Sequence, residues 1–206
     1  MEEKVKSYDH ELCANFVAKK LYWLSNSNDE ASVRAILAKL RRGLGKAPGD
    51  LPELWEFTLE GLPEELLSKG HEPTKGEWAV HIALSLFAFH QQGKDIKSSS
   101  MHKVDKGERH SIGAASRRLS SRSDKDSDAI RRRFNILATS NSLEELSHHL
   151  RAMIGLLKAN DIALDYVQLA SDLYRFQNPN MRSALRLRWG QDFYAFGAAD
   201  EEKTET

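Results

Sequence analysis

The sequence predicts an all-α protein made of two helical bundle domains. Apolar residues recur at helical spacing along most of the chain, helix-capping signals precede several of these segments, and no stretch is a convincing strand. One predicted helix, over residues 76–93, is apolar on nearly every side, because only His81 and Ser85 are polar between positions 78 and 89. A helix without a polar face has no surface for water, so we place it at the centre of the fold.

The first half of the chain is expected to be helical around this central element. We predict a helix over residues 8–24, a second helix whose apolar stripe ends near Gly43, and short helical turns over residues 52–61 and 63–70. The stripe of the second helix consists of Val33, Ile36, Leu37, Leu40 and Leu44. The central helix should begin at a Thr74–Glu77 capping box. It is too short for a membrane span, which needs about 20 apolar residues.

The second half shows the same signals after a polar interruption. The predicted helices are residues 111–119, a helix containing Ile130, Phe134 and Leu137, a helix behind a Ser142–Glu145 capping box, residues 164–176, and residues 181–196. Asn178-Pro179-Asn180 is expected to end the fourth of these helices.

Residues 94–111 show no helical periodicity and contain three consecutive serines. A long irregular loop inside one compact domain is unusual, so this segment favours a domain boundary. We therefore predict an N-terminal helical domain over residues 1–98, a flexible linker over 99–111, a C-terminal helical domain over 112–198, and an acidic disordered tail over 199–206.

Composition restricts the class of protein. The chain of 206 residues is 40% hydrophobic and 29% charged, which suits a folded protein with a core. Its single cysteine, Cys13, excludes an internal disulfide and a cysteine-based metal cluster, and fits a reducing compartment. The charged N-terminus is followed by no apolar run, so we expect no signal peptide, no membrane association and a cytoplasmic protein.

The net charge is zero, but the charges are segregated along the chain. Residues 31–46 carry five basic and no acidic residues, residues 47–77 carry eight acidic residues and two lysines, and residues 101–133 carry ten basic and five acidic residues. Segregated tracts can steer a polyanion although the sum is neutral.

These tracts predict a nucleic-acid interface made of rows of basic side chains on several helices. Arginine is frequent in the rows, and its guanidinium forms two parallel hydrogen bonds with a phosphate. A solvated charged face is the simpler alternative. The candidate residues are Arg34, Lys39, Arg41, Arg42, Lys46, Arg117, Arg118, Arg131, Arg132, Arg133, Arg151, Lys158, Arg182, Arg186 and Arg188.

Catalytic and metal-binding functions find little support in the sequence. The chain has no nucleophile-elbow, Walker-type or zinc-protease motif, so we expect no catalytic residues. Glu145 and His148 have the E-x-x-H spacing of di-iron bundles, but the second pair, Glu77 and His81, is four apart. A capping glutamate followed by an exposed histidine explains the first pair better, so we expect neither a metal nor a cofactor.

The chain resembles the CasB family, the small subunit of the type I-E CRISPR surveillance complex called Cascade, over roughly residues 8–196. The resemblance lies in an ordered set of short segments rather than in one decisive motif, and Gln191 departs from it, because many relatives carry arginine there. The segments are Arg34 to Gly43, Glu77-Trp78-Ala79, Phe87 to Gln92, Ser111-Ile112-Gly113, Arg132 to Asn135, His149-Leu150-Arg151, Leu164-Asp165-Tyr166 and Trp189 to Tyr194.

The resemblance implies an all-helical, non-catalytic subunit with an N-terminal and a C-terminal helical domain. It implies that two copies lie head to tail in the complex beside the other Cascade subunits. It further implies contacts with the guide RNA–target DNA hybrid and with the displaced non-target strand, which stabilise the R-loop. The alternative is a helical scaffold that docks only protein subunits, with the acidic 47–77 tract of one copy against a basic tract of another.

Overall fold

The computed structural model describes residues 8–105, 107–122 and 124–194, apart from the side chains of residues 124 and 125. In these ranges the structure is helical and contains no β-strand, although one isolated bridge joins His102 to Leu164. The all-α prediction is confirmed. The α-helices are α1 (Asp9–Asn26), α2 (Glu30–Arg42), α3 (Trp55–Thr58), α4 (Lys75–His90), α5 (Ile112–Ser120), α6 (Asp124–Thr139), α7 (Leu143–Ala159), α8 (Tyr166–Phe176) and α9 (Pro179–Tyr194), with short 3-10 turns at Pro52–Leu54 and Glu64–Leu66.

Helix α4 is the buried centre that the sequence predicts. The Thr74 hydroxyl accepts a hydrogen bond from the Glu77 N–H at 3.0 Å, and the Glu77 carboxylate accepts one from the Thr74 N–H at 2.7 Å. This capping box satisfies two of the amide groups that a helix start leaves without partners. The helix packs against α1, α2, α7 and α8, so its apolar residues are covered on most sides.

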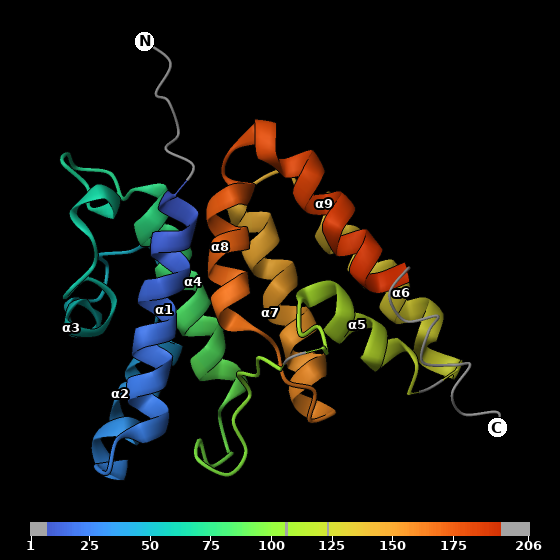
Figure 1. Cartoon of the computed structure of the whole chain (residues 1–206), viewed down its shortest axis with the longest axis horizontal. Coiled ribbons are helices and arrows are strands. Elements are labelled where there is room, and N and C mark those ends of the chain that lie inside the picture. The colour runs from blue at the N-terminus through green and yellow to red at the C-terminus, as the bar shows by residue number, and fades with distance from the viewer. Residues whose placement is uncertain (1–7, 106, 123, 195–206) are drawn as a thin grey trace.

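Helix α8 packs across the predicted domain boundary. Figure 1 shows α1, α2 and α4 on one side of the molecule, α5, α6 and α9 on the other, and α7 and α8 between them. Helix α8 contacts both α1 and α4. The Tyr174 hydroxyl donates to the Asp9 carboxylate at 2.9 Å, and the two halves share one continuous apolar core. The division into two domains stays a prediction, and these contacts couple its two parts.

Helices α5 and α9 cross at a glycine. A side chain at Gly113 would bring its Cβ atom within 2.3 Å of the Trp189 carbonyl oxygen, so only glycine permits this approach. Helix α9 begins at Pro179, two residues earlier than predicted, because proline suits the first position of a helix. The predicted end of this helix at residue 196 and the predicted tail lie outside the described residues.

The described residues between α4 and α5 form no helix, as predicted, and several of them are hydrogen-bonded to the core. The buried Gln91 side chain donates to the carbonyl oxygens of Lys94 and Ser99 and accepts from the Met101 N–H. Further along, the Leu164 N–H donates to the Met101 carbonyl, and the Asp165 N–H donates to the His110 carbonyl. These bonds tie residues 99–105 to the rest of the fold, and the flexible linker over residues 99–111 stays a prediction.

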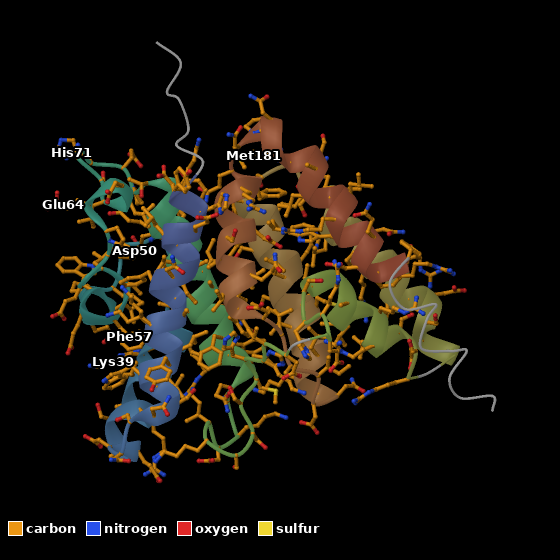
Figure 2. All side chains as sticks on the ribbon, viewed as in Figure 1. Lys39, Asp50, Phe57, Glu64, His71 and Met181 are labelled. Atoms are coloured by element: carbon orange, nitrogen blue, oxygen red, sulfur yellow. The ribbon has the colours of Figure 1, made fainter. Side chains whose placement is uncertain are left out.

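The acidic tract forms an outer edge of the molecule. Figure 2 shows Asp50, Glu64 and His71 along the irregular segment that precedes α4, at the side away from α9. The segment is fastened at its base, where the Lys20 ammonium donates to the carbonyl oxygens of Glu56 and Glu60. Most carboxylates of the segment are exposed, and Glu53 forms an ion pair with Arg42.

Among the described residues, no helix combines the length and the apolar character needed to cross a bilayer.

Candidate nucleic-acid interface

Helix α9 uses its arginines to hold neighbouring helices. The Arg182 guanidinium donates to the carbonyl oxygens of Phe176 and Asn141, at 3.1 and 2.9 Å. Arg186 donates to the Ser140 carbonyl at 2.6 Å. Cations at a helix C-terminus satisfy carbonyl groups that have no partner within the helix. The local geometry thus places Arg182 between the end of α8 and the turn before α7, and Arg186 at the same turn, directly after α6.

Arg188 lies in a buried ion pair. It donates to the Asp172 carboxylate, whose side chain is 1% exposed, and Trp189 Nε1 donates to the other carboxylate oxygen at 2.7 Å. Burial raises the pKa of Asp172, while the Arg188 charge and these hydrogen bonds oppose that shift. Arg188 is therefore committed to the junction of α8 and α9.

The arginines of α5 also contact the protein itself. Arg118 donates to the Glu108 carboxylate at 2.9 Å, to the Arg109 carbonyl at 2.8 Å and to His110 Nδ1 at 2.9 Å. Arg117 donates to the Phe193 carbonyl at 3.3 Å. Because their donors are used inside the fold, the structure adds no support for a nucleic-acid role of the arginines on α5 and α9, and that role stays a prediction.

The arginines of α6 are exposed. Arg131 forms an ion pair with Asp128 on the same helix. Within the described residues, Arg132 and Arg133 have neither a hydrogen bond nor an ion pair. They remain available to a partner, whereas the arginines of the neighbouring α5 and α9 bond to the protein itself.

The remaining candidates on α2 and α7 gather above α4. We define the basic furrow as Arg41 and Lys46 on the α2 side with Arg151 and Lys158 on the α7 side. Both α2 and α7 pack against α4, and the half-buried Phe89 of α4 lies beneath the two cations of the α7 side. The Lys158 ammonium and the Arg151 guanidinium lie 5.1 and 5.9 Å from the Phe89 ring centroid. The structure thus brings together residues more than 100 positions apart in the sequence.

The cations of the furrow repel one another. The pKa of Lys158 is lowered first by burial and then by the charges of Arg41 and Lys94. No furrow residue forms an ion pair in the described part of the chain, and Lys158 donates instead to the neutral Gln92 side chain at 2.9 Å. Clustered like charges oppose folding, and a bound polyanion would relieve this repulsion.

The remaining basic residues of α2 flank the furrow. Arg34 and Arg41 line a second groove of about 440 Å³ with Lys94 and Lys97, beside the end of α4. Arg42 forms an ion pair with Glu53 of the acidic tract. Lys39 is half-exposed on the outer side of α2, where Figure 2 shows it close to Phe57 in projection. The groove of Arg34 and Arg41 therefore adjoins the furrow, whereas Arg42 and Lys39 lie outside it.

One face of α4 forms the floor of the furrow. Trp78, Ile82, Ser85 and Phe89 are spaced by four, three and four residues, which places them on one side of the helix. A cavity of about 600 Å³ lies over the first three of these residues, between the turn after α2 and the start of α7. Proteins that bind single-stranded nucleic acids combine aromatic side chains with a basic groove in this way.

Comparison with known proteins identifies the family. The model of the family described as CRISPR-associated protein Cse2 matches residues 36–194. This chain belongs to the Cse2 family. A Cse2 protein of Thermus thermophilus is 24% identical over 187 residues, which cover 89% of this chain and 92% of that protein.

Solved structures of similar proteins share the fold of this Cse2 chain. The crystal structure of CasB from Thermobifida fusca is 30% identical, with a TM-score of 0.68 over 92% of this chain and 99% of that chain. A chain from a CRISPR RNA-guided surveillance complex is 19% identical, with a TM-score of 0.65 over 96% of this chain and 100% of that chain. At that identity the second likeness shows the fold alone.

The E-x-x-H pair of this Cse2 chain is not assembled into a metal site. The Glu145 carboxylate accepts a hydrogen bond from the Asn141 N–H at 2.7 Å, and the Ser142 hydroxyl accepts from the Glu145 N–H at 3.1 Å. His148 is exposed, so the two side chains have the roles of helix cap and surface histidine that the sequence favours. Cys13 is buried, and burial raises the pKa of its thiol to about 12, far from that of a reactive nucleophile.

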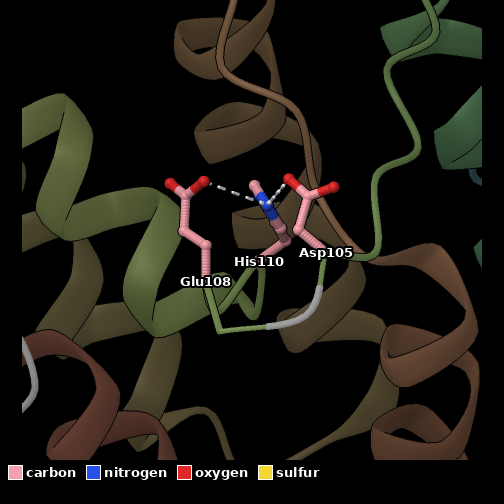
Figure 3. Close-up of side chains that lie close together, drawn as sticks. All are labelled: Asp105, Glu108 and His110. Carbon is pink, nitrogen blue, oxygen red and sulfur yellow. Dashed lines mark hydrogen bonds and ion pairs between the residues drawn. The ribbon is translucent and has the colours of Figure 1, made fainter.

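A cluster that the sequence did not predict lies before α5. Asp105, Glu108 and His110 present potential metal ligands within 4.8 Å of one another (Figure 3). His110 Nδ1 accepts from Arg118, so the ring proton lies on Nε2, the atom that faces Asp105 at 3.2 Å and that a metal would need. Lys103 and Arg118 already neutralise the two carboxylates. The geometry therefore fits an ion-pair network better than a metal site.

Several furrow residues escaped the sequence prediction. Trp78, Ser85 and Phe89 were assigned only to a buried helix, because their partners on α2 and α7 lie far away in the sequence. Lys94, which lines the second groove, falls in the segment over residues 94–111 for which the sequence predicts no helix. The sequence does not show that Trp78 and Phe89 are half-exposed. The one local signal is their spacing, which places them on the same face of the helix as the polar Ser85.

Proposed function

We propose that this protein is a non-catalytic nucleic-acid-binding subunit of a CRISPR surveillance complex of the Cascade type. One observation carries the proposal: Arg41 of α2, Lys46 of the turn after α2, and Arg151 and Lys158 of α7 lie beside α4, and none of the four has an ion pair among the described residues. Membership of the Cse2 family and the likeness to a chain of a surveillance complex support the setting.

The furrow is suited to the backbone of nucleic acid rather than to its sequence. Each phosphate that a cation neutralises releases counterions, which gives affinity that depends on salt and not on base identity. Backbone contacts carry no sequence information, as a subunit that meets arbitrary targets requires. In an R-loop the guide–target hybrid is about as stable as the duplex that it replaces, so a few phosphate contacts decide its persistence.

The proposed ligands are therefore the displaced non-target strand and the guide RNA–target DNA hybrid. The exposed Arg132 and Arg133 of α6 are a second, separate place at which a backbone could bind. The arginines of α9 support the helices, so their removal should affect binding only through folding. A second copy of the chain and the other subunits of the complex are proposed protein partners.

The second candidate function is a scaffold that binds only protein. The acidic edge favours it, because seven exposed or half-exposed carboxylates lie on one segment and could meet a basic surface of another copy. These carboxylates are Asp50, Glu53, Glu56, Glu60, Glu64, Glu65 and Glu72. Reversing the charge of Glu53 and Glu56 should then disrupt self-association and leave DNA binding intact.

A binding experiment with the isolated protein separates the two functions. A DNA duplex with an unpaired bubble is titrated with protein in a gel-shift assay at two salt concentrations. Binding that weakens strongly at the higher salt supports the nucleic-acid subunit. No shift even at low salt, together with self-association that depends on the acidic edge, supports the scaffold.

A further inference from the structure

We propose that the cavity at the α7-start end of the furrow binds one unpaired nucleobase of a strand whose phosphates lie on Lys46 and Arg151. This inference rests on the proposed function and adds to it a preference for single-stranded nucleic acid. The cavity lies between the turn after α2, the first half of α4 and the start of α7, and its volume is about 600 Å³. Ligand pockets of about 300–1,000 Å³ hold molecules of nucleotide size.

An aromatic and an aliphatic side chain supply the wall against which a base can stack. Trp78 and Ile82 line the cavity, and the indole of Trp78 is only half-buried. Within a folded protein, a partly uncovered tryptophan beside a cavity leaves apolar surface in water. Stacking on an aromatic ring accepts every base, because each base has a π-face.

The base edge would meet a hydroxyl that has no partner in the protein. Ser85 lines the cavity and is 1% exposed, and its Oγ atom has no hydrogen-bond partner among the described residues. Buried polar groups are nearly always satisfied, so an orphan beside a cavity indicates a missing ligand or water. A hydroxyl both donates and accepts, so it suits any base edge and selects none.

Gly43 keeps this end of the cavity open. A Cβ atom at position 43 would lie 2.8 Å from Ser85 Oγ and 2.9 Å from a Leu54 methyl group. The Gly43 carbonyl is fixed by the buried His81 ring, with Nε2 2.9 Å from the oxygen. The glycine thus brings the backbone close to α4 and leaves the Ser85 hydroxyl uncovered by a side chain.

The charges at the rim identify the occupant as part of an anion. Lys46 and Arg151 are both exposed and lie on opposite sides of the cavity, on the turn after α2 and on α7. Glu144 is the one acidic side chain among the lining residues, and His148 is exposed beside it. Two cations above an apolar floor fit a nucleotide, with the phosphate outside and the base inside, better than they fit an apolar peptide.

Only an unpaired nucleotide can bind in this way. A base in a duplex is stacked and paired, and extruding it costs a few kcal/mol. The displaced strand of an R-loop has already lost its pairing, so its bases enter the cavity without that cost. The cavity would therefore make the furrow bind a single strand more tightly than a duplex of the same charge.

A thermodynamic cycle tests the proposal. The full chain is titrated, by fluorescence anisotropy at low salt, with a 12-nucleotide DNA strand and with a strand of equal charge that lacks all its bases. We expect the wild type to bind the strand with bases about 5-fold or more tightly, and Trp78→Leu to bind both strands with nearly equal affinity. Trp55→Leu removes an exposed tryptophan from the acidic edge and should keep the wild-type preference. Thermal unfolding of each variant confirms that it is folded.

The other outcomes overturn the proposal in distinguishable ways. If the wild type binds both strands equally, the cavity takes no base, while the proposed backbone binding stands. If the preference survives in Trp78→Leu, the bases bind elsewhere. If neither strand binds at low salt, the nucleic-acid function itself fails. Ser85→Ala is a second variant that leaves the aromatic wall intact, and it should lower the preference without abolishing it.

Discussion

The Lys158 ammonium lies 5.1 Å from the centroid of the Phe89 ring and joins α7 to α4 across the floor of the furrow. Arg151, two helical turns earlier on α7, lies over the same ring at 5.9 Å. Gly155 between them leaves room, because even an added Cβ atom would stay 3.9 Å from the ring. A cation–π contact at a partly exposed site is worth about 0.5–1 kcal/mol. One aromatic ring thus positions two cations without neutralising them.

Removing one furrow cation should not destabilise the protein. The charge of Arg41 lowers the pKa of Lys158, which means that the two cations repel each other in the folded state. We therefore expect Arg41→Gln to unfold at the same or a higher temperature than the wild type, and to raise the pKa of Lys158. Thermal unfolding and NMR titration of the lysine ammonium measure both effects. A clear loss of thermal stability would show that Arg41 has a structural role instead.

Removing Arg188 should destabilise the protein, because this arginine pairs with the buried Asp172 between α8 and α9. Arg188→Leu leaves the Asp172 carboxylate buried without its cation, and breaking a buried pair costs roughly 3–5 kcal/mol. Leu187→Ala, on the adjacent residue with 63% exposure, is the matched control and should change stability by less than about 0.5 kcal/mol. Urea unfolding of both variants makes the comparison. Equal effects would contradict the structural role of Arg188 at the junction of α8 and α9.

Two glycines should respond to alanine with opposite signs. Gly155→Ala adds a Cβ atom at ordinary contact distance from Phe89, and it should stabilise α7 by about 0.5–1 kcal/mol through helix propensity. Gly113→Ala places a Cβ atom 2.3 Å from the Trp189 carbonyl oxygen, so α5 and α9 must separate. We expect a higher melting temperature for the first variant and a lower one for the second. Melting temperatures that change in the same direction would show that the close approach at Gly113 is not a constraint.

A buried histidine makes stability depend on pH. His90 is fully buried, its Nδ1 lies 2.9 Å from the Tyr166 hydroxyl, and burial together with Lys94 and Lys158 lowers its pKa to about 3. His90 therefore takes up a proton near pH 6.5 in the unfolded chain but only near pH 3 in the folded chain. The contribution of His90 to the free energy of unfolding is complete above pH 6.5 and falls as the pH decreases towards 3.

The size of this effect can be measured directly. Between pH 7 and pH 5 the His90 contribution should fall by roughly 2 kcal/mol, and His90→Asn, which retains a donor near the Nδ1 position, should lose that part of the pH dependence. Urea midpoints at the two pH values give the difference. Burial lowers the pKa values of His10, His81 and His102 as well, so a residual acid sensitivity is expected in the variant. An unchanged pH dependence would contradict the assignment.

Local signals in the sequence predicted the individual helices well, but they did not predict which helices pack against each other. The Thr74–Glu77 capping box and the all-round apolar run of α4 were visible because they depend on residues within one helix. The packing of α8 against α1 was not visible, because it joins positions about 160 residues apart. Local periodicity says which face of a helix is apolar, but not which helix covers that face.

The same limit applies to the candidate site. Arg41 and Arg186 have similar settings in the sequence, each at the edge of a helix with further arginines nearby. They differ because the carbonyl end of α6 lies within hydrogen-bond distance of Arg186, while Arg41 faces other cations. Spacing within one helix cannot reveal that difference. The tertiary structure therefore separates two arginines that look alike in the sequence, and the nucleic-acid role of each stays a prediction.

The salt dependence of single-strand DNA binding by Arg41→Gln/Lys158→Gln tests the central claim most directly. Lys69→Gln/Lys75→Gln removes the same charge from exposed positions outside the furrow and is the matched control. The plot of log affinity against log salt concentration should be flatter by up to roughly 1.4 for the furrow variant, about 0.7 for each lost phosphate contact on a single strand, and unchanged for the control. A slope that is unchanged in the furrow variant, or flattened equally in both variants, would contradict binding in the furrow.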